Sequence, residues 1–431
     1  MLLVYSHKIT PRLTYIFKHF FVRILQIPVI FTTKVDEFVA HNGPKITYTN
    51  KPLGSEFFIR SQGLLFEQGI NDVEVNVSTW DDVPCFFYEG ESSTIPFDIF
   101  SASFYLITRY EEYLPHVQDI HERFPADESL AFKNDFLEKP VIDIWAFKFL
   151  ELLKEKFPNY EYKEREFTQI STIDVDTAFA YKHKGIVRSL GGYLKDIFQF
   201  NFSNLWNRLL TNLNFRADYY NTFSKILAYK KEKNINTLFF FLLGDYTTYD
   251  KNISFSNNKF RSLIKSVADY TKIGLHPSYF SLKNEEKLKK EKKRLEGITN
   301  TPTEFSRQHY LRLIIPDTYQ SLIDLDIKED YSMGFAKRAG FRASTCTPFY
   351  FYDLDFEIQT PLKIVSFAFM DVTLKQYMGL NNKECLDKIL ELKDEVKKVN
   401  GTFVSLFHNE TLSENLYWKG WTPIYEEMLD A

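Results

Sequence analysis

Cysteine is scarce in this chain, and the few cysteines suggest no covalent framework. Three occur among 431 residues, at Cys85, Cys346 and Cys385. An odd number of widely separated cysteines is not typical of a disulfide scaffold or of a thiolate zinc site, and it fits a reducing compartment. Glycine and proline are also few, at 16 each, which argues against long disordered linkers.

The sequence has no excess of either charge and no long hydrophobic run. With 53 basic and 57 acidic residues it carries no electrostatic footprint for nucleic acid, so a nucleic-acid partner is not expected. Basic residues interrupt the apolar N-terminal stretch at positions 8, 12, 18 and 23, before a signal peptide or a membrane span is complete. We therefore expect no transmembrane segment and a cytoplasmic protein.

The chain is long and rich in aromatic side chains. Aromatic residues make up 17% of it, including 42 Phe and 26 Tyr, which is enough for a large core. A chain of 431 residues exceeds the usual size of one core, so two domains are expected. We place the boundary in the charged, aperiodic run at 161–166, which gives domains at 1–165 and 166–431.

The first part of the chain has the alternating pattern of a smaller α/β domain. Apolar runs at 2–5, 28–32 and 45–48 predict strands, and apolar spacing at 12–25 predicts a helix. Further helices are expected after Asp98, a suitable N-cap, and at 142–156. Between them, His116 and His121 could suggest a metal site. Two histidines in irregular sequence lack a fixed ligand geometry, so a solvated loop between the domains is the favoured interpretation.

Strand and helix patterns alternate again from residue 167 onward, which predicts a mainly parallel sheet or barrel. Several of these strands run directly into polar side chains. The polar residues are Asp174, Asp176, His276, Arg307, His309, Arg342 and His408. Because active sites of parallel α/β folds gather at the carboxyl ends of strands, we expect these side chains to share one site.

Asp174 and Asp176 end the strand around which this site is organised. Side chains alternate across a strand, so the two carboxylates point to the same side and together attract a cation. A turn that closes the strand would explain an isolated Asp-x-Asp equally well. The functional interpretation therefore depends on the residues further along the chain.

The collected side chains suit metal-assisted hydrolysis of an amide or ester. One carboxylate and two neutral imidazoles are suitable ligands for a borderline divalent metal such as zinc, with a position left open for water. A second carboxylate could take a proton from the water, and another histidine could protonate the leaving group. A glycosidase that uses Asp174 and Asp176 is a weaker alternative, because carboxyls two residues apart on one strand lie closer than the roughly 5 to 9.5 Å that glycosidases need.

Five short motifs resemble one family. They are TIDVD at 172–176, GLHPS at 274–278, RQHY at 307–310, GFRA at 340–343 and LFH at 406–408. This order resembles the polysaccharide deacetylases with a NodB-homology domain, of the carbohydrate esterase family four type, over about residues 167–431. The resemblance implies a distorted (β/α) barrel that removes acetyl groups from N-acetyl sugars with a divalent metal. The stretches at 98–113 and 119–124 resemble an uncharacterised domain that precedes such modules in some bacterial proteins.

The resemblance implies a role for each matching residue. Asp174 corresponds to the general base and His408 to the general acid. Arg307 corresponds to the arginine that holds the base through a charge-assisted hydrogen bond. Asp176 and His276 correspond to metal ligands. Asp330 and Asp371 could orient His408 or Arg307, or could equally be helix-cap or turn residues.

The sequence departs from the family pattern at its second metal histidine. Phe280 stands at that position and cannot bind metal, so His309 is our replacement ligand. Arg342, Tyr310 and Trp418 are the candidate substrate-binding residues, although core packing or a domain interface would explain Trp418 better.

The sequence thus predicts a metal-dependent hydrolase, most simply a zinc enzyme, that removes N-acetyl groups from an amino-sugar-containing glycan or glycan precursor. The alternative is a non-catalytic glycan-binding or scaffold protein on a decayed deacetylase barrel. The missing second histidine is the main support for that alternative.

Overall fold

The computed structural model describes residues 1–90 and 92–431. Its N-terminal sheet is fully parallel, in the order β2-β1-β3-β4. A separate antiparallel hairpin, β5-β6, follows it in the chain. The strands are β1 (Leu2–Tyr5), β2 (Val29–Thr32), β3 (Lys45–Thr49), β4 (Phe57–Arg60), β5 (Ser78–Trp80) and β6 (Val83–Cys85). The three strands expected from the sequence in this region are confirmed as β1, β2 and β3.

Six α-helices are described in the first part of the chain. They are α1 (Pro11–Phe17), α2 (Val35–Ala40), α3 (Ile99–Ile107), α4 (Tyr110–Tyr113), α5 (Leu130–Lys133) and α6 (Val141–Lys156). The helix expected at 12–25 begins as α1 and continues as a wider π-helical turn at Lys18–Ile24. Asp98 caps α3 as expected, because its carboxylate accepts from the N–H groups of Phe100 and Ser101. Arg109, with a left-handed φ of 56°, separates α3 from α4.

The second part of the chain forms one nine-stranded sheet in the order β12-β13-β11-β10-β9-β8-β7-β15-β14. Neighbouring strands are parallel except for the antiparallel pair β12-β13. The strands are β7 (Thr168–Val175), β8 (Asn236–Leu242), β9 (Lys272–His276), β10 (Phe305–Ser306), β11 (Glu329–Asp330), β12 (Phe349–Asp353), β13 (Ile358–Ile364), β14 (Phe369–Met370) and β15 (Thr402–His408). The predicted α/β class is confirmed. The predicted barrel is not, because among the described strands β12 and β14 are the two edges of the sheet and do not pair with each other.

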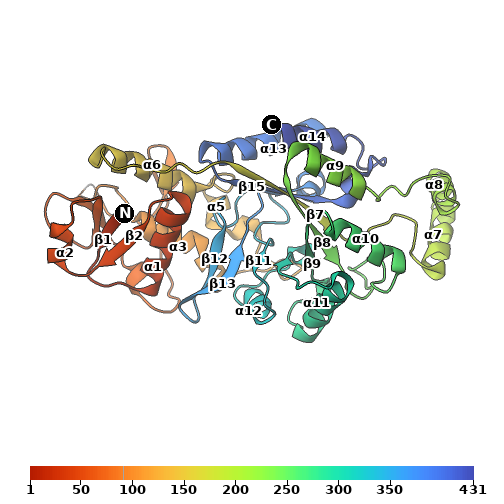
Figure 1. The fold of residues 1–431 in the computed structure, drawn as a ribbon, viewed down its shortest axis with the longest axis horizontal. Coiled ribbons are helices and arrows are strands. Elements are labelled where there is room, and N and C mark those ends of the chain that lie inside the picture. The colour runs from red at the N-terminus through yellow and green to blue at the C-terminus, as the bar shows by residue number, and fades with distance from the viewer. Residues whose placement is uncertain (91) are drawn as a thin grey trace.

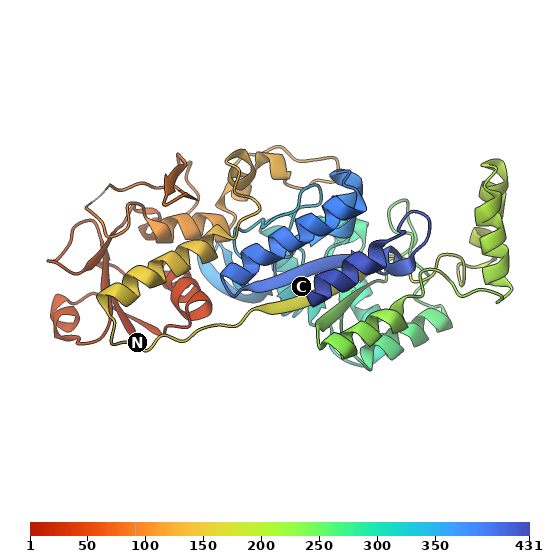
Figure 2. The same ribbon diagram turned by 90° about the horizontal axis from the view of Figure 1, so that it is seen from above.

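Helices cover this larger sheet, and one pair stands apart from it (Figure 1). The covering helices are α9 (Phe223–Lys233), α10 (Asn258–Ala268), α11 (Glu285–Thr299), α12 (Asp317–Asp324), α13 (Asn382–Lys398) and α14 (Trp421–Asp430). The pair α7 (Ile186–Phe198) and α8 (Phe202–Asn212) projects away from the body in both views (Figures 1 and 2). Among the described residues, none of the helices combines the length and apolar character needed to cross a bilayer.

Buried ion pairs join the first part of the chain to the second. Glu112 accepts two hydrogen bonds from the guanidinium of Arg342, at 2.9 and 2.6 Å, and a third from Arg109 at 2.7 Å. Asp143 of α6 is fully buried, pairs with Arg165 at 2.7 Å and contacts the second part of the chain through the hydroxyl of Thr345, which donates to it at 2.6 Å. The two parts of the chain are therefore joined by buried charged contacts as well as by a shared apolar core.

Parallel register aligns the carboxyl ends of the central strands. Asp174 at the end of β7 lies opposite His408 at the end of β15. Leu242 of β8 lies opposite His276, the last residue of β9. Polar residues that are more than two hundred positions apart in the sequence therefore meet at one edge of the sheet.

Candidate active site

Three side chains at this edge, Asp176, His276 and His309, form a group that could hold a metal ion. Each offers one ligand atom, and these atoms all lie within 4.8 Å of one another. The Nε2 atom of His276 is 3.2 Å from Oδ1 of Asp176, and the Nε2 atom of His309 is 3.4 Å from Oδ2. The structure thus places His309, which the sequence suggested as the replacement ligand, beside the other two. Phe280, by contrast, is 44% exposed.

Hydrogen bonds fix the orientation of both imidazole rings. The Nδ1 atom of His276 bonds to the backbone carbonyl of Arg307. The Nδ1 atom of His309 bonds to the buried carboxylate of Asp250 at 2.9 Å. Because each Nδ1–H is used as a donor in this way, each Nε2 lone pair faces Asp176. This is how outer carboxylates and carbonyls orient metal-binding histidines.

The charge balance of this group also suits a cation. Oδ1 of Asp176 is buried and makes no hydrogen bond to any described residue. Burial opposes ionisation of Asp176, but His309, His276 and His408 outweigh burial and hold the pKa of this carboxyl well below its usual range. Burial would likewise lower the pKa of His309, yet Asp176 and Asp250 raise it to about 9. A bound cation would satisfy the same carboxylates without protonating an imidazole, so the residues present fit a divalent metal.

Asp174 lies next to this group and is held by a buried arginine. The Nη1 atom of Arg307 donates to Oδ1 of Asp174 at 3.0 Å and to Oγ1 of Thr172 at 2.7 Å, and Nε donates to the carbonyl of Tyr331 at 3.0 Å. The other oxygen of Asp174 is 3.7 Å from Nε2 of His276. The carboxylate is therefore fixed on one side and faces the ligand group on the other.

His408 occupies the opposite side of the group, supported by Asp371. Its Nδ1 atom bonds to Oδ1 of Asp371 at 2.8 Å, and its backbone N–H donates to Oδ2 at 2.7 Å. Its Nε2 atom is 3.8 Å from Oδ2 of Asp176. Burial would lower the pKa of His408, but Asp371, Asp176 and Asp174 outweigh burial and raise it well above the usual value. Of the two carboxylates expected to orient a site residue, Asp371 contacts His408.

A cleft with a volume of about 370 Å³ opens over these residues. Six of the sequence-predicted site residues line it: Asp174, Asp176, His276, His309, Tyr310 and His408. Tyr249, Tyr377 and Arg123 complete parts of the wall. Aromatic faces thus border a polar floor, the arrangement expected of a site for a sugar ring.

Arg307 lies behind the floor of the cleft, and three other residues considered from the sequence lie outside its lining. Arg342 is buried, with its guanidinium bound to Glu112, so the substrate-binding role expected for it is not supported by its position. Trp418 is also buried and packs edge-on against Trp421 with ring centroids 5.2 Å apart, the core alternative foreseen for it. Asp330 accepts from Ser306 and Ser332, which ties β10 to the segment after β11.

The sequence analysis missed Asp250 and the contacts of Arg123. Asp250 lies eight residues beyond the end of β8, too far for a strand-end search to find it. In the loop, Arg123 is buried, pairs with Asp119 at 2.7 Å and donates to the carbonyl of Tyr310 at 2.8 Å. The loop is exposed at Val117 and Ile120, as expected of a solvated segment, and Arg123 contributes its side chain to the wall of the cleft.

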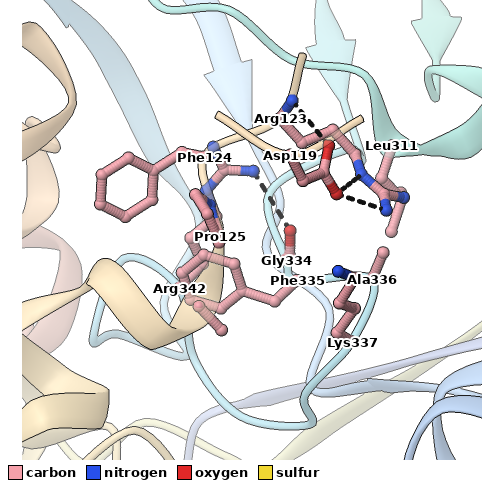
Figure 3. A pocket seen from close by; sticks show the side chains of 11 residues that line it. Asp119, Arg123, Phe124, Pro125, Leu311, Gly334, Phe335, Ala336, Lys337 and Arg342 are labelled. Atoms are coloured by element: carbon pink, nitrogen blue, oxygen red, sulfur yellow. Dashed lines mark hydrogen bonds and ion pairs between the residues drawn. The ribbon is translucent and has the colours of Figure 1, made fainter. Parts of the chain in front are cut away.

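A second, smaller hollow lies beside this loop. Figure 3 shows the Asp119–Arg123 pair on one side of it and Arg342, which donates to the carbonyl of Gly334, on the other. Its volume of about 20 Å³ leaves room for little more than a water molecule. The larger cleft is therefore the candidate site.

Comparison with known proteins finds a family model that matches part of the chain and solved structures of low similarity. Residues 2–158 match a family described as "Family of unknown function (DUF7033)". No curated protein matches the chain.

Solved structures similar to this chain include a polysaccharide deacetylase, a CE4 family pseudoenzyme and an allantoinase. A polysaccharide deacetylase from Bacillus cereus shares 10% identity over 62% of this chain and 88% of its own, with a TM-score of 0.31. A CE4 family pseudoenzyme from Bacillus anthracis shares 12% identity over 62% and 63%, with a TM-score of 0.30. The Puue allantoinase shares 11% identity over 62% and 84%, with a TM-score of 0.37. Similarity this low does not establish a shared activity.

Proposed function

We propose that this protein is a divalent-metal-dependent hydrolase that removes N-acetyl groups from an amino-sugar-containing glycan or glycan precursor. One observation carries the proposal. A ligand group of one carboxylate and two imidazoles lies between a second carboxylate, Asp174, and a third histidine, His408. Each of these two has its own buried partner, Arg307 for Asp174 and Asp371 for His408.

Asp176, His276 and His309 would hold the metal. When bound, such an ion lowers the pKa of a water molecule and polarises an acyl carbonyl. Zinc is the metal that this mixed oxygen and nitrogen donor set suits best. The tautomers imposed by the Arg307 carbonyl and by Asp250 keep both Nε2 atoms available for that purpose.

Asp174 acts as the general base in this proposal. Its Oδ1 atom is engaged by Arg307, so the carboxylate cannot rotate away from the cleft. Its Oδ2 atom faces His276 at 3.7 Å, on the side where a water bound by the ligand group would lie. A carboxylate at that position can accept a proton as the water attacks the acetyl carbon.

His408 acts as the general acid. Asp371 binds its Nδ1, which directs Nε2 toward the cleft and stabilises the protonated ring. A protonated imidazole placed there can give its proton to the departing amine nitrogen as the C–N bond breaks. Asp174 and His408 come from adjacent strands in direct register, so the base and the acid flank one position in the cleft.

The lining of the cleft supports a carbohydrate substrate. Tyr249, Tyr310 and Tyr377 offer aromatic faces, and Arg123, Gln308 and Glu410 offer polar groups. A sugar ring binds proteins through such mixed surfaces, with its apolar face on an aromatic ring and its hydroxyls on polar side chains. The scaffold alternative was supported mainly by the phenylalanine at position 280, which cannot bind metal. That support is weaker because His309 lies beside Asp176 and can take the place of the missing histidine.

The test is deacetylation of N-acetylglucosamine oligomers by the zinc-loaded full chain, with acetate release as the readout. Asp174→Asn removes the base but no ligand, so we expect loss of activity with full metal content. His276→Ala removes a ligand, so we expect loss of both. Activity equal to the parent in either variant, or no acetate release by the parent from any N-acetylated sugar, would refute the proposal.

A further inference from the structure

The helical pair α7 and α8, with its flanking residues 182–216, forms an arm that projects from the body of the molecule. Figures 1 and 2 show it at one end, well away from both sheets. The arm is inserted between β7 and α9, directly after Asp176. Asn409, next to His408, donates to the carbonyl of Thr177 at 3.2 Å and of Tyr220 at 2.9 Å. Both ends of the insertion are therefore hydrogen-bonded to Asn409, beside the candidate site.

The apolar side chains of the arm face solvent. On α7 these are Ile186, Val187, Leu190, Leu194, Ile197 and Phe198, each between 47% and 84% exposed. Their spacing of three to four residues places them on one side of the helix. The connection between the helices adds Phe200, and α8 adds Phe202 and Trp206, all at least 60% exposed.

The polar side chains of the arm face inward, where they hold the two helices together. Asp196 of α7 and Arg208 of α8 are buried and pair at 2.7 Å. Asn204 donates to Asp196 at 2.6 Å, and Asn212 donates to the hydroxyl of Tyr193 at 2.9 Å. A Cβ atom at Gly192 would lie 2.4 Å from the Arg208 guanidinium, so a larger residue there would displace the end of this side chain. The pair is thus inverted relative to a water-soluble helical hairpin, whose apolar faces pack together.

The charge of the arm is strongly positive. Residues 182–216 contain six Lys or Arg residues and one acidic residue, whereas the whole chain has a formal charge of −4. The single acidic residue is Asp196, which is already paired with Arg208. Lys195 and Arg216 are exposed. A surface that covers the apolar face would therefore have to supply negative charge.

These features favour a lipid surface over a second copy of the chain. Two arms that met face to face would bring their basic residues together without an acidic partner on either arm. Aromatic side chains on the apolar face and basic side chains around it are instead the composition of helices that lie in a membrane interface.

We infer that the arm binds the surface of an anionic lipid bilayer, with α7 and α8 lying in the interface plane. The apolar face enters the boundary between headgroups and acyl chains, and the basic residues contact the anionic headgroups. Asn409, which lies beside the candidate site, forms hydrogen bonds with both ends of the insertion. Binding of the arm to the bilayer would therefore hold the cleft close to the membrane. The inference does not depend on the reaction proposed for the cleft.

The test is flotation of the full chain with vesicles of phosphatidylcholine and phosphatidylglycerol, compared with vesicles of phosphatidylcholine alone. We expect binding to the anionic vesicles that weakens as salt is raised, since surface charges are screened. The double substitution Phe198→Ser with Trp206→Ser should reduce the bound fraction by about tenfold or more. Phe356→Ser, which removes an exposed aromatic side chain from the turn between β12 and β13, should leave it unchanged.

Two results would overturn the inference. One is failure of the parent chain to float with anionic vesicles at low salt. The other is equal flotation by the parent and by the Phe198→Ser, Trp206→Ser variant. If sedimentation then showed a dimer that this variant dissociates, a second copy of the chain would be the occupant of the apolar face. Trp206 gives an independent signal, because its fluorescence should shift to shorter wavelength with anionic vesicles, measured as the difference between the parent and Trp206→Phe.

Discussion

His408 donates its Nδ1–H to Asp371 at 2.8 Å and directs its Nε2 toward Asp176, 3.8 Å away. Asp371 is fully buried and also accepts from the backbone N–H groups of His408 and Val372 and from the hydroxyl of Thr411, so its position is fixed by four donors. This relationship gives His408 a defined tautomer and a defined direction. The proposed acid therefore depends on a carboxylate that touches neither substrate nor metal.

Replacing Asp371 with asparagine should impair the acid and leave the metal in place. The neutral amide of Asp371→Asn could accept from His408 but could not stabilise its charged form, so less of the ring is protonated near neutral pH. We expect kcat to fall by roughly 10² to 10⁴, with KM nearly unchanged and with the loss of activity on the alkaline side of the pH profile beginning at lower pH. A loss confined to KM, or a loss of metal, would assign Asp371 another role.

Replacing Asp250 with asparagine should weaken metal binding. Asp250 orients His309 through a 2.9 Å hydrogen bond, and loss of such a partner commonly costs roughly 10- to 100-fold in metal affinity. Isothermal titration with zinc measures the change. Asp245→Asn is the matched control, because Asp245 belongs to the same loop but pairs with Arg294. Equal zinc affinity in the two variants would remove Asp250 from the site.

The buried pair between the two parts of the chain should matter for stability. Removing Glu112 leaves Arg109 and Arg342 buried without their shared carboxylate, and breaking a buried pair in this way costs about 3–5 kcal/mol. Urea unfolding of Glu112→Ala measures it. Glu151→Ala removes an exposed pair with Lys154 and should cost no more than about 1 kcal/mol. Similar losses in both variants would mean that the junction is not held by charge.

Stability should fall in acid partly because of His19. This imidazole is fully buried, and neither ring nitrogen has a hydrogen-bond partner among the described residues. Burial lowers the pKa of His19 from 6.5 to about 3. The unfolded chain therefore binds a proton that the folded chain does not, and stability declines as the pH falls from about 6.5 toward 3, by up to about 1.4 kcal/mol per pH unit.

His19→Leu should remove this part of the acid dependence, because leucine fills a similar volume and does not titrate. The measurement is the difference in unfolding free energy between the parent and the variant at pH 7 and at pH 4.5. His7→Leu, at an exposed position, is the control. A parent-to-variant difference that does not change with pH would show that His19 is already satisfied when charged.

Much of the site followed from one physical regularity, that parallel strands end at a common edge. Asp174, His276 and His408 each end an apolar strand, and the structure aligns them as the sequence suggested. Arg342 did not follow the rule, because residues 334–348 form no strand and the arginine is used to join the two parts of the chain. Asp250 lies in an irregular loop, where the spacing of residues in the sequence does not indicate which side chains meet. Its contact with His309 therefore could not be predicted from the sequence.

The absence of barrel closure among the described strands and the outward apolar face of the arm also could not be predicted from the sequence. Closure depends on how the edge strands β12 and β14 are placed, which strand patterns do not encode. The spacing of Ile186, Leu190 and Leu194 does encode an amphipathic helix. It does not show which way the apolar side faces, whereas the structure shows these side chains exposed and the Asp196–Arg208 pair buried between the helices.

The metal content of the purified chain tests the central claim most directly. If Asp176, His276 and His309 hold one ion, the parent loaded with zinc and dialysed should retain one zinc per chain by elemental analysis, and His309→Ala should retain far less. Phe280→Ala, at the position where the resembled family carries its histidine, should retain the parental amount. Equal zinc in the parent and in His309→Ala, or none in the parent, would contradict the account.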